Sequence, residues 1–159
     1  MIDLSKDLVE ILAHLISIES ETDNEKEICD LIERTLNHYD GKVIREGNSL
    51  VLNLNYNKDK TIALVGHIDT VPVNKSSTKP IIKDGEIWGR GACDMKAGVA
   101  AILKVLYHLN KGEITPNYNV CMVFYEGEEG SIPNGINILL DNNHLDHVDF
   151  AYILEPTEG

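Results

Sequence analysis

Three short apolar runs constrain the fold more than any other feature of this chain. They read "TIALVG" (61–66), "YNVCMVFY" (118–125) and "FAYILE" (150–155), and each is apolar with little alternation. Continuous apolar runs of this length are typical of strands covered on both faces, as in parallel sheets between helices. Helical patterns separate them, so we expect an α/β sandwich with a mixed, largely parallel sheet and buried strands.

The helical patterns fall between and before these strands. Residues 95–109 are apolar nearly all round, which predicts a buried helix, and residues 134–143 predict a shorter one. Residues 4–18 have the period of an amphipathic helix. Thr22 and Glu25 form a capping-box pattern that would open a second amphipathic helix.

Two hairpins complete the predicted elements. "KVIRE" and "SLVLNL" flank Gly47 and Asn48, and "IIKDGEIW" contains Asp84 and Gly85 as its turn. We see no repeat, low-complexity tract or linker. The 159 residues are therefore expected to form one domain over 1–159.

Charge and composition exclude some partners. The formal net charge is -12, which opposes binding to nucleic acid or to an anionic membrane. No apolar run approaches the ~20 residues of a membrane span. The first residues lack the pattern of a signal peptide, and the three cysteines form no C-x-x-C pair. We expect a cytoplasmic protein without nucleic-acid or membrane partners.

Polar residues gather where the apolar strands end. "GHIDTVP" follows the first strand, "YEGEEG" the second and "EPTEG" the third, while "GRGACDMKAG" leads into the buried helix. Ligands of open α/β sheets bind beyond the carboxyl ends of the strands. The four clusters are therefore candidates for one site.

Taken singly, the residues of these clusters have ordinary explanations. His67 and Asp69 point the same way on extended backbone, as in a metal ligand with an orienting carboxylate, but also as in a loop salt bridge. Asp94 precedes a helix and could be its cap. Glu155 could be an exposed strand end.

The glutamates of "FYEGEEG" raise a question of charge. Two carboxylates about 4 Å apart repel by roughly 4 kcal/mol at an effective dielectric near 20. Either a positive group lies beside Glu128 and Glu129, or one of them is protonated, or the segment is a solvated turn.

These four motifs, in their order along the chain ("GHIDTVP", "GRGACDMKAG", "FYEGEEG" and "EPT"), resemble those of the dinuclear zinc metallopeptidases of the aminoacylase and carboxypeptidase type. Within that family, "REGNSLVLNL" and "ILEPTEG" are most similar to succinyl-diaminopimelate desuccinylases, notably the actinobacterial type. Acetylornithine deacetylases and dipeptidases are similar in the same motifs. The resemblance implies a three-layer zinc-peptidase-like catalytic domain, here without its lid domain, that hydrolyses the amide bond of N-succinyl-diaminopimelate in lysine and diaminopimelate biosynthesis.

The resemblance also implies a set of metal ligands. His67 and Glu155 would bind one zinc, Glu129 the second, and Asp94 would bridge the two; Co²⁺ or Mn²⁺ could replace Zn²⁺. A cis peptide would follow Asp94. Two Zn²⁺ would neutralise the adjacent glutamates. A non-catalytic metal-binding or interaction domain is the alternative of another class.

The catalytic roles follow in the same way. Asp69 would orient the imidazole of His67. Glu128 would be the general base that takes a proton from water and returns it to the leaving amine. Glu126 has no role in the family pattern and is expected in solvated loop. Cys93 is expected to be a small buried residue rather than a ligand or nucleophile.

The family pattern continues past "EPT", whereas this chain stops at Gly159. The resemblance places the second zinc's histidine, a lid histidine and the dimer contact in the later part. We therefore expect the N-terminal part of a catalytic domain, with one tight zinc site and no activity of its own. The complete enzyme would be a homodimer through its lid and would act on a small N-acyl amino acid.

Overall fold

A five-stranded mixed sheet organises the computed structural model, which describes residues 1–72 and 79–157. Its strand order is β1-β2-β6-β3-β7. β1 pairs with β2, and β2 with β6, in antiparallel fashion, whereas β3 lies parallel to both β6 and β7. The bounds are β1 Lys42–Glu46, β2 Ser49–Leu54, β3 Thr61–His67, β6 Asn119–Tyr125 and β7 Phe150–Ile153.

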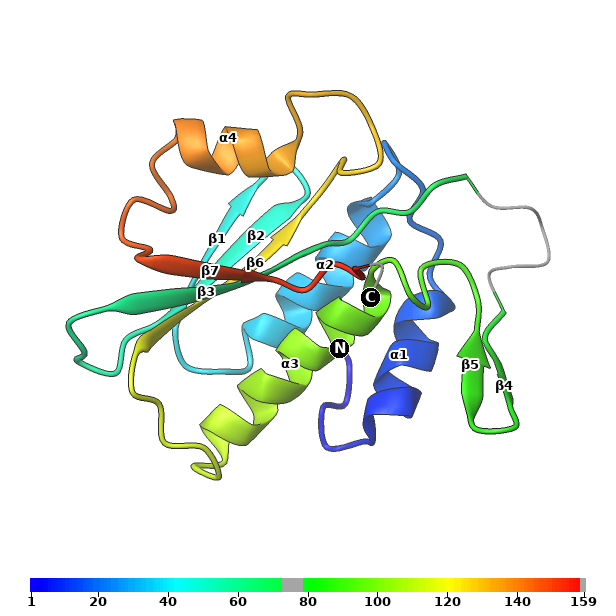
Figure 1. Ribbon diagram of the computed structural model, residues 1–159, viewed down its shortest axis with the longest axis horizontal. Helices are drawn as coiled ribbons and strands as arrows, with labels where there is room; N and C mark the ends of the chain where they lie inside the picture. Colours follow the sequence, from blue (N-terminus) through cyan, green and yellow to red (C-terminus); the bar gives the residue numbers. More distant parts are fainter. Residues whose placement is uncertain (73–78, 158–159) are drawn as a thin grey trace.

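Three helices cover one face of this sheet: α1 (Leu8–Ile16), α2 (Lys26–Leu36) and α3 (Lys96–Asn110) (Figure 1). Their buried side chains pack with one set of alternating residues of β2 and β6, including Leu52 and Met122, in the main hydrophobic core. α3 is at least half-buried along its length except at its last residue, which confirms the prediction of a buried helix.

The fourth helix, α4 (Gly135–Asp141), lies on the opposite face (Figure 1). Leu139 packs there with the other alternating set, which includes Val51, Val65 and Val123. The crossover from β3 to β6 thus runs through α3 on one face, and that from β6 to β7 through α4 on the other. The domain has three layers, as expected.

The starts of the first two helices differ from the prediction. α1 begins at Leu8 rather than at residue 4, because the side chain of Asp7 accepts the backbone N–H of Glu10 at 2.8 Å and caps the helix. The predicted capping box is wrong. Glu25 itself occupies the N-cap position of α2 without a side-chain cap bond, and the hydroxyl of Thr22 is engaged elsewhere.

Both predicted hairpins are present. Gly47 and Asn48 join β1 to β2. The strands β4 (Ile81–Lys83) and β5 (Glu86–Trp88) form a separate two-stranded sheet. Its turn residues Asp84 and Gly85 have φ of 54° and 83°, the left-handed backbone that a two-residue turn of this type requires.

The expectation that β7 is a buried strand is wrong. Its four residues are all exposed, with Phe150 and Tyr152 each at 56% and Ile153 at 61%. Among the described strands β7 lies at the edge of the sheet and pairs with β3 alone, and the helix that precedes it packs over β1 and β2 instead. The apolar sequence of β7 indicated a strand, but it did not indicate whether a helix would cover that strand.

Candidate metal centre

The parallel strands bring the expected site residues to one rim. His67 is the last residue of β3 and pairs in register with Tyr125, the last residue of β6. The backbone N–H of Leu154, one residue after β7, donates to Val65 of β3 at 3.0 Å. Because the carboxyl ends of parallel strands coincide, Glu155 follows at the same edge. The last two residues of "EPTEG" lie outside the described part of the chain.

His67 is fully buried, and its two ring nitrogens face different partners. Nδ1 lies 3.0 Å from the backbone oxygen of Asp69 and 3.3 Å from its Oδ1. Nε2 lies 3.1 Å from Asp94 Oδ1 and 3.5 Å from Glu155 Oε1. With the Nδ1 proton directed to Asp69, the lone pair of Nε2 points toward two further carboxylates, the geometry of a histidine that shares a cation with them.

The charges around His67 change its protonation. Burial by itself would lower the pKa of His67, but the hydrogen bond and charge of Asp69, with the charge of Glu155, raise it to about 9. A proton therefore balances these carboxylates when no other cation does. A divalent cation at Nε2 would displace that proton and supply more positive charge.

Asp69 joins the histidine to the loop that carries the paired glutamates. Its buried carboxylate accepts the backbone N–H of Glu128 at 3.0 Å and that of Glu129 at 3.1 Å. The hydroxyl of Thr22 donates to the same carboxylate at 2.9 Å. Burial acts to raise the pKa of Asp69, yet these donors and His67 hold it below its usual value, so Asp69 remains an anion.

Two groups of side chains place ligand atoms close enough to share a cation. They are His67 with Asp94 and Glu155, and His67 with Glu128 and Glu129, in each of which the ligand atoms lie within 4.8 Å of one another. Asp94 is followed by a cis peptide bond to Met95, as the resemblance implied.

The carboxylates of these two groups repel one another and would be stabilised by a shared cation. Glu155 Oε1 is buried and makes no hydrogen bond with any residue that the structure describes. Burial, followed by the charges of Asp94 and Glu128, raises the pKa of Glu155. Burial and the charge of Asp94 likewise raise the pKa of Glu129. A divalent metal would coordinate the unpaired oxygen of Glu155 and offset the repulsion among the carboxylates.

Several contacts of this site were missed by sequence reasoning. Thr22 was assigned to a helix cap, and its hydroxyl instead holds Asp69. Met95 Sδ accepts the backbone N–H of His67 at 3.1 Å, and the ring of Tyr125 meets the imidazole edge-on at 6.1 Å between centroids. The contact between Thr22 and Asp69 joins residues that lie 47 positions apart, so no local pattern in the sequence indicates it. Lys96 does leave a signal in the sequence, because a lysine is unusual at the start of an otherwise apolar helix.

Two other expectations are corrected. Glu126 is half-buried rather than solvated, because its Oε1 accepts the backbone N–H of Asn48 at 3.0 Å and so holds the β1–β2 turn. Cys93 is exposed rather than buried, since the loop before α3 turns its side chain to solvent.

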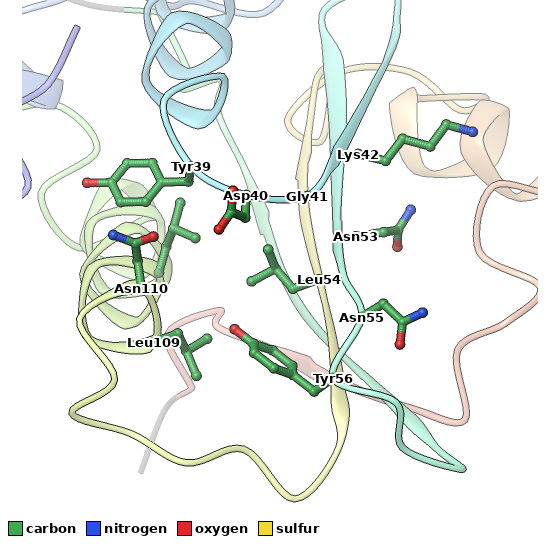
Figure 2. A pocket seen from close by; sticks show the side chains of 11 residues that line it. Tyr39, Asp40, Gly41, Lys42, Asn53, Leu54, Asn55, Tyr56, Leu109 and Asn110 are labelled. Carbon is green, nitrogen blue, oxygen red and sulfur yellow. The ribbon is translucent and has the colours of Figure 1, made fainter.

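A cavity of about 570 Å³ lies away from this rim (Figure 2). It is lined by the segment after α2, the end of β2 and the end of α3, where Tyr56 extends toward Leu109 while Lys42 points away (Figure 2). Neither group of potential ligands contributes to it. The cavity is therefore separate from the candidate metal centre.

The three-layer domain, with a cluster of carboxylates and a histidine at its strand ends, has the architecture of a metallopeptidase-type α/β domain. The sequence profile of peptidase family M20/M25/M40 matches residues 63–159, and the chain belongs to this family. The resemblance recognised from the motifs is thus confirmed.

Similar proteins extend the comparison beyond the profile. A Mycobacterium tuberculosis protein assigned as a succinyl-diaminopimelate desuccinylase is 35% identical over 100% of this chain and 45% of its own length. A tripeptidase from Staphylococcus aureus superposes with a TM-score of 0.78 at 28% identity, over 99% of this chain and 45% of that one.

A Bacillus subtilis protein described as a dinuclear metal-binding peptidase of the M20 family shares the fold. Its TM-score is 0.70 at 18% identity, over 92% of this chain and 41% of that one. The chain thus spans less than half the length of each of these three proteins. In the described part of the chain, no helix is long and apolar enough to cross a membrane.

Proposed function

We propose that this chain supplies the metal-binding rim of a zinc-dependent amide hydrolase whose substrate is N-succinyl-diaminopimelate. The observation that carries the proposal is that the two ring nitrogens of His67 have different partners. Its Nδ1 faces Asp69 while its Nε2 faces Asp94 and Glu155. The 35% identity to the Mycobacterium tuberculosis relative supports the choice of substrate.

In this proposal His67, Asp94 and Glu155 hold the first metal ion, and Asp94 and Glu129 contribute to the second. When bound, the metals would lower the pKa of water and polarise the amide carbonyl. Asp69 keeps the Nδ1 proton of His67 directed away from the metals. It also fixes the backbone of the loop on which Glu128 stands.

Glu128 is exposed at the rim, where it can reach both water and substrate. It would take one proton from the attacking water as the new C–O bond forms. It would then deliver that proton to the nitrogen as the C–N bond breaks. The products are succinate and diaminopimelate, and no oxidant or further reactant is required.

A second candidate is hydrolysis of short peptides, which the 28% identity to the Staphylococcus aureus tripeptidase favours. Both reactions break an amide bond with the same groups. They differ in the residues that would bind the rest of the substrate.

A chimaera tests whether this chain supplies a working part of an amide hydrolase, because it corresponds to 45% of the Mycobacterium tuberculosis relative. This chain would be joined to the remaining part of that relative, and the product checked for folding and bound zinc. We expect release of succinate from N-succinyl-diaminopimelate, and loss of turnover in Glu128→Gln. Cleavage of tripeptides alone would favour the second candidate. A folded, zinc-loaded chimaera that cleaves neither substrate would refute both.

A further inference from the structure

Lys96 is a buried lysine that belongs to neither group of potential metal ligands. It is the first residue of α3 and is only 1% exposed. Its ammonium donates to the backbone oxygens of Leu15 at 3.1 Å and Ile18 at 2.7 Å. Burying an amine is costly unless it is hydrogen-bonded, so these two bonds hold the end of α1 against the start of α3.

The same lysine lies beside the loop of Asp94. Its backbone N–H donates to the oxygen of Gly91 at 2.8 Å and closes that loop. Gly91 has φ of 77°, and a Cβ there would lie 3.0 Å from both Cγ and Cδ of Lys96. The loop that presents Asp94 is therefore folded against the stem of Lys96.

The segment that Lys96 binds also contacts the loop of His67 and Asp69. Residues 17–25, which we name the connecting segment, join α1 to α2. In it Ser20 donates its hydroxyl to Ile68 at 2.8 Å and accepts the backbone N–H of Thr70 at 2.8 Å. Thr22 of the same segment holds Asp69.

We propose that Lys96 is a positioning residue that sets the separation of His67 and Asp94. It does so by tying the Asp94 loop to the connecting segment, which is itself bonded to the loop after β3. Lys96 touches no reacting atom. This inference rests on the proposed function, because it assumes that His67 and Asp94 share a metal ion.

Lys104 provides a matched control on the same helix. Its ammonium also donates to two backbone oxygens of the N-terminal segment, those of Leu4 at 3.0 Å and Lys6 at 2.7 Å. It lies two turns further along α3, away from the Asp94 loop. Lys96→Met and Lys104→Met each remove one charge and two hydrogen bonds, and Lys104→Met also removes a contact of the ammonium with the ring of Tyr107 at 4.6 Å. We expect only the first substitution to loosen the proposed metal site.

Zinc affinity would be measured on the 159-residue chain by competition with a chromophoric chelator, together with the stability of the metal-free chain in urea. We expect Lys96→Met to weaken zinc binding by about 10-fold or more, the usual effect of a residue that orients a ligand. Lys104→Met should bind zinc as the unaltered chain does. Loss of a positive charge alone would strengthen cation binding, so a weaker site in Lys96→Met reports position.

Unchanged zinc affinity in Lys96→Met, or equal weakening in both variants, would overturn the inference. Failure of the unaltered chain to bind zinc would instead refute the proposed function. Hydrogen exchange of the unaltered chain covers the case in which Lys96→Met does not fold. Zinc should then slow exchange at the amides of Ser17 and Ile18 more than at Lys6, and equal effects at both ends of α1 would overturn the proposal.

Discussion

The carboxylate of Asp69 accepts the backbone N–H of Glu128 at 3.0 Å while it also faces Nδ1 of His67. One buried anion thereby orients the imidazole and fixes the loop of the paired glutamates. The two loops follow neighbouring parallel strands, β3 and β6, so a short side chain can span them. The orientation of His67 and the placement of Glu128 are coupled through this residue.

Asp69→Asn should damage both loops at once. An amide of the same shape presents a donor where two backbone N–H groups now meet oxygens, and leaving a buried donor unpaired costs about 1–3 kcal/mol. We expect that loss in urea unfolding of the metal-free chain, together with weaker zinc binding. Asp149→Asn is the control, because Asp149 accepts the backbone N–H of Thr61 at the other end of β3. Unaltered zinc binding in Asp69→Asn would contradict the orienting role.

Metal content should distinguish the two proposed metal ions. The ligands proposed for the second ion, Asp94 and Glu129, differ from the second group of close ligand atoms, which is His67, Glu128 and Glu129. His67, Asp94 and Glu155 offer three side chains to one ion, whereas Asp94 and Glu129 alone would hold the second. After extensive dialysis we expect about one zinc per chain, since tight sites use three or more protein ligands. His67→Ala should abolish this retention and Glu129→Gln should preserve it. Two retained ions, or none after zinc is supplied, would count against the assignment.

The metal-free chain should lose stability as the pH rises from 6.5 toward 8. The pKa of His67 is raised from 6.5 to about 9 by Asp69 and Glu155, against the effect of burial. In this window the folded state therefore holds a proton that the unfolded state has released, and stability falls by up to about 1.4 kcal/mol per pH unit.

The window ends near pH 8, because burial lowers the pKa of Lys96 to about 8 and the opposite trend begins there. Urea unfolding at pH 6.5, 7.2 and 8 measures the slope, and His67→Gln should flatten it. Zinc affinity should rise over the same range, because the metal must displace the proton on His67. Stability that increases from pH 6.5 to 8 in the unaltered chain would be the contrary result.

Substitutions of the adjacent residues Glu128 and Glu129 should have different effects in the chimaera. Glu128→Gln should keep its zinc and lower kcat at least ~10²-fold, the scale of a lost general base. Glu129→Gln should release the second zinc more readily. Kinetics and metal analysis of the two variants, side by side, decide the matter. An exchange of these effects would reverse the two roles.

Local sequence patterns determined the strands, the buried helix and the candidate residues of the rim. The runs that became β3 and β6 are apolar over consecutive residues, and α3 is apolar around nearly all of its circumference. Residues close in sequence therefore suffice to define these elements. His67, Glu128 and Glu155 were found because each follows such a run.

Only the tertiary structure decided which partners these residues take. Thr22 and Glu25 match a helix cap locally, yet Thr22 bonds Asp69, 47 residues away, and Glu126 bonds Asn48, 78 residues away. Lys96 finds Leu15 across 81 residues. Such pairs depend on strand order and on which face each crossover takes, and hydrogen-bonding groups of this kind have no preference among distant partners until the sheet brings one within reach.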